Sequence, residues 1–103
     1  MSVVVRGETK EFVLELPGID LTGQDVFVTL RQGSTALKID EPQTAADETG
    51  STVVIHLTQE NTLAFQPGNV AVEVKAKDEN GNVRATWPFG SFMVTQTLRN
   101  EVV

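Results

Sequence analysis

Cysteine and tyrosine are absent from this chain of 103 residues, which has a single histidine. Without cysteine there is no disulfide framework, no thiolate zinc site and no cysteine nucleophile. Basic residues are also few, with 8 against 14 acidic residues and a formal net charge of -6. This balance argues against a nucleic-acid partner, because duplex binding usually needs a basic face.

Long hydrophobic runs are lacking as well. The N-terminal stretch from Met1 to Arg6 is too short to contain the hydrophobic region of a signal peptide. No apolar run approaches the roughly 20 residues of a membrane-spanning helix. We therefore expect no signal peptide and no membrane partner. The length and the ordinary apolar content of 40% predict one domain over residues 1–103.

Apolar residues recur at every second position over most of the chain. Successive side chains of a strand point to opposite faces, so this alternation predicts strands with one buried and one solvated face, as in antiparallel sheets. The predicted core residues are Phe12, Leu14, Leu16, Val26, Val28, Leu30, Val53, Ile55, Leu57, Val70, Val72, Val74 and Trp87.

Turn residues separate the alternating runs. Asn80-Gly81, between predicted strands 69–77 and 82–87, is the strongest hairpin signal, because both residues tolerate the positive φ of a type I′ turn. Gly33-Ser34 predicts a second hairpin. Residues 40–50 show no periodicity, so we predict a mobile surface loop there.

One segment, residues 58–65, departs from the period of two. It predicts a single helical turn with Thr58 as the N-cap and Glu60 near the positive end of the helix dipole. Leu63 and Phe65 would then tuck under the edge of the sheets. With a short first strand at residues 3–5, the chain has about seven predicted strands. The predicted fold class is an all-β, immunoglobulin-like antiparallel β-sandwich with one short helical turn.

The last strand changes parity. Odd-numbered apolar residues at 83–89 give way to even-numbered Phe92 and Val94. Pro88 lacks an amide donor and suits an edge strand or a bulge. A bulge within residues 88–91 would keep both sets of side chains inside the sandwich. Without a bulge, Phe92 and Val94 would lie on an outer face and need a partner subunit.

The last strand and tail, residues 89–103, are the predicted surface for self-association or docking. A terminal strand with open backbone donors and acceptors is a natural place for another chain to add a strand. The alternative is that the tail after Thr97 is merely frayed. The candidate interface residues are Phe92, Met93, Val94, Leu98, Val102 and Val103.

Residues for catalysis or metal binding do not form a recognisable motif. His56 has outward parity and no evident nucleophile, orienting carboxylate or ligand set. Ser91 lacks the second glycine of a nucleophile elbow. The loop at 78–82 lacks the glycine and glutamate positions of an EF-hand. We therefore expect no enzymatic activity, no cofactor and no metal site.

The aromatic residues Trp87, Phe89 and Phe92 leave a second function open. They pack in the core, or they form a platform for sugar rings. The second case would make the chain a carbohydrate- or surface-binding β-sandwich module.

Several short phrases also occur in a characteristic order along nearly the whole chain. They are Arg6-Gly7-Glu8-Thr9, Asp20-Leu21-Thr22-Gly23-Gln24-Asp25-Val26, Leu57-Thr58-Gln59-Glu60-Asn61-Thr62, Pro67-Gly68-Asn69-Val70-Ala71-Val72-Glu73-Val74 and Asp78-Glu79-Asn80-Gly81-Asn82.

In this order the phrases resemble small immunoglobulin-like virion proteins of tailed phages and prophages of Gram-positive bacteria. Their layout is similar to the N-terminal domain of the upper baseplate protein of such phages. The resemblance implies a non-catalytic phage structural protein, a tail or baseplate component that acts through protein–protein contacts with other virion proteins and with copies of itself. It implies a place in the virion after synthesis in the host cytoplasm. Because no second domain follows Val103, we expect a free-standing accessory or assembly protein.

His56 is predicted to be dispensable for stability and function. Because its side chain is expected on the outer face, His56→Gln should change the free energy of unfolding by no more than about 0.5 kcal/mol, as for ordinary surface substitutions. Urea denaturation of the variant beside the parent measures this. Loss of assembly or of a bound metal in the variant would contradict the prediction.

Overall fold

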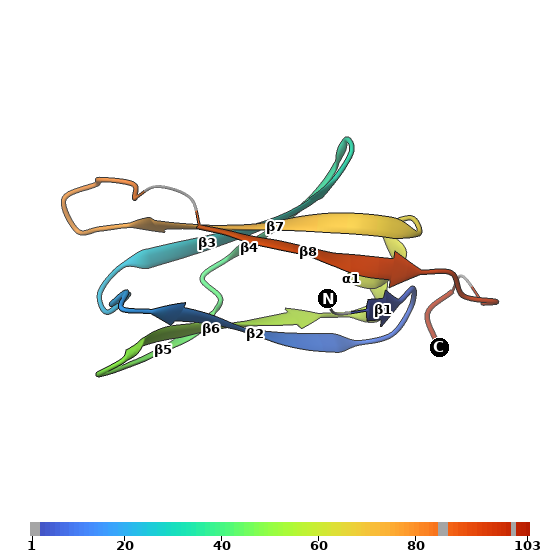
Figure 1. The fold of residues 1–103 in the computed structure, drawn as a ribbon. Helices are drawn as coiled ribbons and strands as arrows, with labels where there is room; N and C mark the ends of the chain where they lie inside the picture. The colour runs from blue at the N-terminus through green and yellow to red at the C-terminus, as the bar shows by residue number, and fades with distance from the viewer. Residues whose placement is uncertain (1–2, 85–86, 100) are drawn as a thin grey trace.

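Two β-sheets stack face to face in the computed structural model, which describes residues 3–84, 87–99 and 101–103 (Figure 1). The single short helix lies at the end of the stack where the first strand is found (Figure 1). In chain order the elements are β1 (Val3–Val5), β2 (Lys10–Pro17), β3 (Asp25–Gln32), β4 (Thr35–Asp40), β5 (Gln43–Asp47), β6 (Gly50–Leu57), α1 (Gln59–Leu63), β7 (Gly68–Lys77) and β8 (Trp87–Thr95).

The larger sheet has five strands in the order β1-β8-β7-β3-β4, and the smaller has three in the order β2-β6-β5. All neighbouring strands are antiparallel except β1 and β8, which run parallel. The predicted all-β sandwich is therefore confirmed, and the hairpin at Gly33-Ser34 is present between β3 and β4.

One strand was not expected. β5 lies in the stretch predicted to be a loop, and it pairs with β6 from Gln43↔Val54 to Asp47↔Gly50. Every side chain of β5 is exposed, so no apolar alternation marks it in the sequence. Its strand conformation depends on backbone pairing with β6, which is a long-range contact that local patterning does not report.

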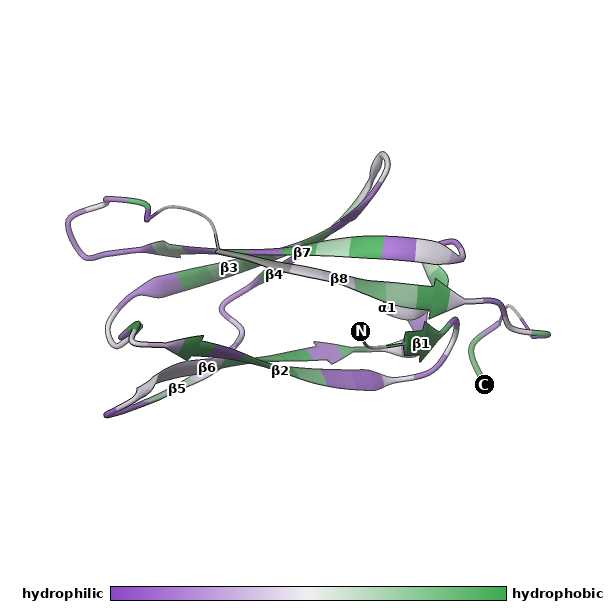
Figure 2. Cartoon of the chain, viewed as in Figure 1, coloured by the Kyte–Doolittle hydropathy of each residue, from purple (hydrophilic) through white to green (hydrophobic). Residues whose placement is uncertain are grey.

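The core lies between the sheets and follows the predicted parity. Val28 and Val74 are opposite each other in the register of β3 and β7, and both are fully buried. Hydrophobic and hydrophilic bands alternate along β7 (Figure 2). Of the predicted core, Phe12 and Leu14 are only half-buried, and the side chain of Trp87 lies outside the described part of the structure. The buried apolar residues are Val4, Leu16, Leu21, Val26, Val28, Leu30, Val53, Ile55, Leu57, Phe65, Val70, Val72, Val74, Ala76, Phe92 and Val94.

The predicted helical turn is confirmed, together with its cap. The hydroxyl of Thr58 accepts a hydrogen bond from the amide of Asn61 at 3.1 Å, and the side chain of Asn61 accepts one from the amide of Thr58 at 2.9 Å. This reciprocal pair is a capping box, which satisfies two amides that the helix itself leaves free. Beyond the turn, Phe65 is fully buried.

The turn after β7 differs from the prediction. The amide of Gly81 donates to the carbonyl of Asp78 at 3.1 Å, but only Gly81 has positive φ, so the type I′ turn predicted for Asn80-Gly81 is wrong. Of the strand predicted at 82–87, residues 82–84 hold a single bridge from Lys77 to Val83, residues 85–86 lie outside the described part, and Trp87 begins β8. Val83 is 58% exposed rather than inside. The carboxylate of Asp78 fixes this turn by accepting two backbone hydrogen bonds, which compete with a regular ladder.

A bulge restores the parity of β8. Val72 pairs with Gly90 and Glu73 with Pro88, so Phe89 is an extra residue in the ladder. Past this point Phe92 and Val94 point inward and are buried. The bulge predicted from the parity change is thus present, and the alternative, in which these two side chains need a partner subunit, is wrong.

The structure predicts a severe effect of charge at the centre of β7. Val74→Asp would bury an unpaired carboxylate and should lower the free energy of unfolding by on the order of 4 kcal/mol. Asn69→Asp, on the exposed face of the same strand, should change it by about 0.5 kcal/mol or less. Urea denaturation of both variants tests this, and a parent-like midpoint for Val74→Asp would show that the parity of β7 is wrong.

Candidate functional site

One long side of the sandwich is open between β2 and β8. A cleft of about 110 Å³ enters the core there, lined by residues of both sheets. The half-buried side chains of Phe12 and Leu14 form its β2 wall, and Phe92 lies opposite, with its ring centroid 5.0 Å from that of Phe12. The cleft is therefore apolar surface that the fold leaves partly exposed.

The backbone edges beside this cleft are unequal. In the described part of the chain, β2 pairs only with β6, so its other edge is free. Among the described residues, β1 covers β8 over Met93–Thr95. The expectation that the whole terminal strand has open donors and acceptors is therefore wrong at its C-terminal end, where the parallel partner β1 occupies them.

β1 is itself a protected edge. The amide of Val5 donates to the carboxylate of Glu8 at 2.8 Å, and the carbonyl of Val5 accepts from the amide of Glu8 at 3.0 Å. These bonds occupy the polar groups of Val5 that another strand would need, which is one way in which proteins blunt edge strands.

The six candidate interface residues separate into two groups. Phe92 and Val94 are 3% and 1% exposed, so they are core residues and not interface residues in this fold, because the bulge turns them inward. Met93 is half-buried on the outer face. The three exposed members are Leu98, Val102 and Val103.

The tail is not simply free. The amide of Val103 donates to the side-chain oxygen of Gln59 at 2.7 Å, and the Gln59 amide group donates back to the carbonyl of Val103 at 3.2 Å. This reciprocal pair holds the end of the chain against α1. For the exposed tail residues before Val103, fraying and docking on a partner both stay predictions.

His56 lies on the outer face, as predicted. Its Nδ1 is 3.4 Å from the Glu11 carboxylate directly across the strand pair, and both side chains are more than half exposed. The two residues share a shallow hollow with Thr58, whose hydroxyl already caps α1. A His–Glu pair takes part in catalysis only when a reacting group is held within hydrogen-bond reach of it. Glu11 and His56 have the geometry of an exposed side-chain pair on neighbouring strands.

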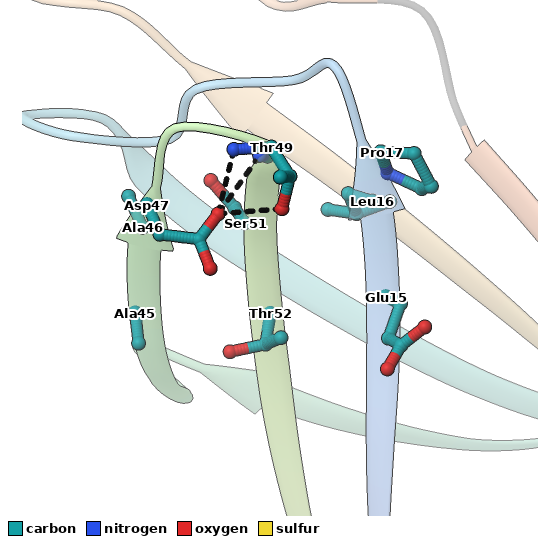
Figure 3. Close-up of a pocket in the computed structure, with 10 residues that line it drawn as sticks. Glu15, Leu16, Pro17, Ala45, Ala46, Asp47, Thr49, Ser51 and Thr52 are labelled. Carbon is teal, nitrogen blue, oxygen red and sulfur yellow. Dashed lines mark hydrogen bonds between the residues drawn. The ribbon is translucent and has the colours of Figure 1, made fainter.

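A larger hollow of about 520 Å³ lies at the turn between β5 and β6. Figure 3 shows the Asp47 carboxylate turned toward Thr49, whereas Glu15 lies on the far side of β6. Asp47 Oδ1 accepts hydrogen bonds from the Thr49 hydroxyl at 2.7 Å, from the Thr49 amide at 2.8 Å and from the Gly50 amide at 3.2 Å. These bonds, the Thr49 hydroxyl first, hold the pKa of Asp47 below its usual value.

Gly50 is required at this turn. Its φ is +150°, and a Cβ placed on it would overlap the carbonyl oxygen of Leu16. β6 therefore approaches β2 closely at this point. The hollow is a consequence of that tight turn.

Buried hydroxyls hold two loops onto the sandwich, and sequence reasoning missed them. Ser51, expected in a turn, is buried in β6, where its Oγ accepts from the Leu21 amide at 3.0 Å and donates to the Ile19 carbonyl at 2.7 Å. Thr62 accepts from the Gly7 amide at 2.9 Å in the same manner. The only local signal for Ser51 was its inward parity with Val53.

Comparison with known proteins adds no family. No protein-family model matches the sequence, and no curated protein is significantly similar to it.

Neither a metal-binding cluster nor a membrane-spanning helix occurs in the described ranges. Among residues 3–84, 87–99 and 101–103, no three His, Asp or Glu side chains gather closely enough to hold a metal ion. Over the same ranges no helix is long and apolar enough to cross a membrane.

The Asp47 turn predicts a dependence of stability on pH. Because its folded pKa is lowered, its contribution is present above the usual pKa of 3.8 and is lost as the pH falls below it. Asp47→Asn should therefore be less stable than the parent at neutral pH, and the difference should shrink in acid. Thermal melts from neutral pH to acid measure this. Glu48→Gln is the matched control, since Glu48 makes no hydrogen bond or ion pair within the described residues. A pH-independent difference for Asp47→Asn would contradict the prediction.

Proposed function

We propose that this chain is a non-catalytic structural component of a phage or prophage virion, in the tail or baseplate, and that it acts through protein–protein contacts. The observation that carries the proposal is the open side of the sandwich. The free edge of β2 runs beside a cleft in which the apolar side chains of Phe12 and Leu14 are half exposed. A free edge next to apolar surface is where other chains add strands or dock.

Further support comes from the order of turn and strand phrases in the sequence. The phrase at 6–9 forms the turn that ties β1 to α1, and the phrase at 57–62 forms the cap and body of α1. These residues therefore have structural roles, which is what a virion scaffold requires. The proposed partners are other virion proteins and further copies of this chain.

The alternative of a carbohydrate- or surface-binding module needs exposed aromatic rings. Phe92 is buried and packs edge-on against Phe65, with ring centroids 6.5 Å apart, so it does not offer a face to a sugar. The side chains of Trp87 and Phe89 lie outside the described part of the structure. No described side chain favours this alternative over a structural role.

The proposal predicts that the chain is a stoichiometric part of an assembled particle. Particles induced from a lysogen that encodes the chain are purified by density gradient and quantified by mass spectrometry. We expect the chain at a fixed ratio to the other tail proteins, retained after a high-salt wash. A chain found only in the soluble fraction would overturn the proposal, and specific binding on a glycan array would then favour the alternative module.

A further inference from the structure

The two outer faces of the sandwich carry different charges. On the small sheet, the outward positions of β2, β5 and β6 include the carboxylates Glu11, Glu15 and Asp47 but no lysine or arginine. His56, 3.4 Å from the Glu11 carboxylate, lies on the same face. Between the two glutamates stands Val13, an apolar side chain that is 56% exposed. We call the surface of Glu11, Val13, Glu15 and Asp47 the acidic face.

The outer face of the large sheet is hollowed and lined by cations. The hollow has a volume of about 430 Å³ and spans β3, β4, β7 and β8. Arg31, Lys38 and Lys75 line it, and Glu73, 3.7 Å from the Lys75 ammonium, is the carboxylate among them. Within the described residues, Arg31 and Lys38 make no ion pair. We call this site the basic hollow.

Small residues create the basic hollow. Ala71 and Gly90 belong to its lining, and Gly90 lies at the bulge of β8 with φ +90°. A Cβ placed on Gly90 would meet no atom within 4 Å, so the space above it is open. The bulge that turns Phe92 and Val94 into the core therefore also leaves a depression on the outer surface.

The spacing of charges on the two surfaces agrees. Glu11 and Glu15 are four residues apart on one strand, which separates their Cα atoms by about 13 Å. Phe27 pairs with Lys75, and Arg31 is four residues further along β3. One strand spacing combined with that rise separates Arg31 from Lys75 by about 14 Å. The two carboxylates thus match the two cations in spacing, with Thr29 and Glu73 between the cations and Ala71 beside Arg31.

From this match in charge and spacing we propose that the acidic face of one copy docks on the basic hollow of a second copy. Val13 of one copy enters the hollow of the other. Glu11 and Glu15 lie against its cations. The proposal rests on the proposed function, because it names a second copy as one partner of a virion component. The contact joins two different surfaces, so it is head-to-tail, and repetition builds a ring or an open stack.

Sheet edges fit a second copy less well. The edge of β1 is already occupied by Glu8 at Val5. Antiparallel pairing of two β2 strands about Val13 would place Glu11 directly opposite Glu15 of the second copy, and like charges at such positions repel. Face-to-face docking avoids this repulsion.

Charge reversal on each surface separately tests the contact. One variant carries Arg31→Glu and Lys75→Glu, the other Glu11→Lys and Glu15→Lys. Sedimentation velocity and light scattering of the purified full chain are measured across concentration at low salt.

The parent should self-associate, and added sodium chloride should weaken this self-association by screening the charges. Each variant alone should associate at least about tenfold more weakly, because like charges then meet. An equimolar mixture should associate again, since the intact acidic face of the first variant meets the intact basic hollow of the second.

Control variants separate this contact from other causes. Glu79→Lys with Glu101→Lys raises the net charge by as much as Glu11→Lys with Glu15→Lys, but outside both surfaces, and should leave association unchanged. Thermal melts check that every variant is folded. A monomeric parent, parent-like association of both charge-reversed variants, or a mixture that stays monomeric would overturn the proposal.

A chain shortened after Gln96 should still associate, and loss of association there would overturn the proposal by placing the contact in the tail. Because these measurements use the purified chain alone, their failure is distinct from absence of the chain from particles.

Discussion

One extra residue in β8 sets the arrangement of the last third of the molecule. The bulge at Phe89 lets the strand keep its pairing with β7 on both sides while its side-chain parity changes. Phe92 thereby turns inward, where it packs against the rings of Phe12 and Phe65 from the other sheet and from the end of the helical turn. Without the bulge, the aromatic cluster of Phe12, Phe65 and Phe92 would lose its central member. The same bulge opens the outer surface at Gly90, so the core and one proposed contact surface depend on a single irregularity.

Side-chain hydrogen bonds fix the loops against the apolar core. Ser51 and Thr62 are buried, and each satisfies backbone groups of a distant loop with its hydroxyl. The Arg6 guanidinium adds hydrogen bonds to the carbonyls of Phe65 and Leu63 at 2.7 and 2.9 Å. Such bonds contribute little net free energy when formed, but an orphaned buried partner is costly, so they fix loop positions precisely. Ser51 fixes the loop after β2, whereas Thr62 and Arg6 tie the chain just after β1 to α1 and the segment that follows it.

The remaining surface divides into parts with different physical character. The free edge of β2 adjoins apolar surface, and the outer face of the small sheet is acidic. The outer face of the large sheet holds Arg31 and Lys38, which form no ion pair with any residue that the structure describes. A chain with net charge -6 repels its own copies at long range, so close association needs local complementarity of this kind. A structural role through protein contacts therefore agrees with where charge and apolar area are exposed.

Sequence patterns alone predict the class of fold, the strands with alternating burial, the capped turn at Thr58 and a bulge near Pro88, because each depends on parity or on side-chain bonds between near neighbours. The folded structure adds that residues 43–47 form a strand, that β1 pairs in parallel with β8, and that Ser51 is a buried tether. It also decided that Phe92 and Val94 belong to the core and not to an interface, and it brought Arg31, Lys38 and Lys75 together. These features depend on which strands become neighbours, and residues far apart in the chain carry no local signal of that pairing.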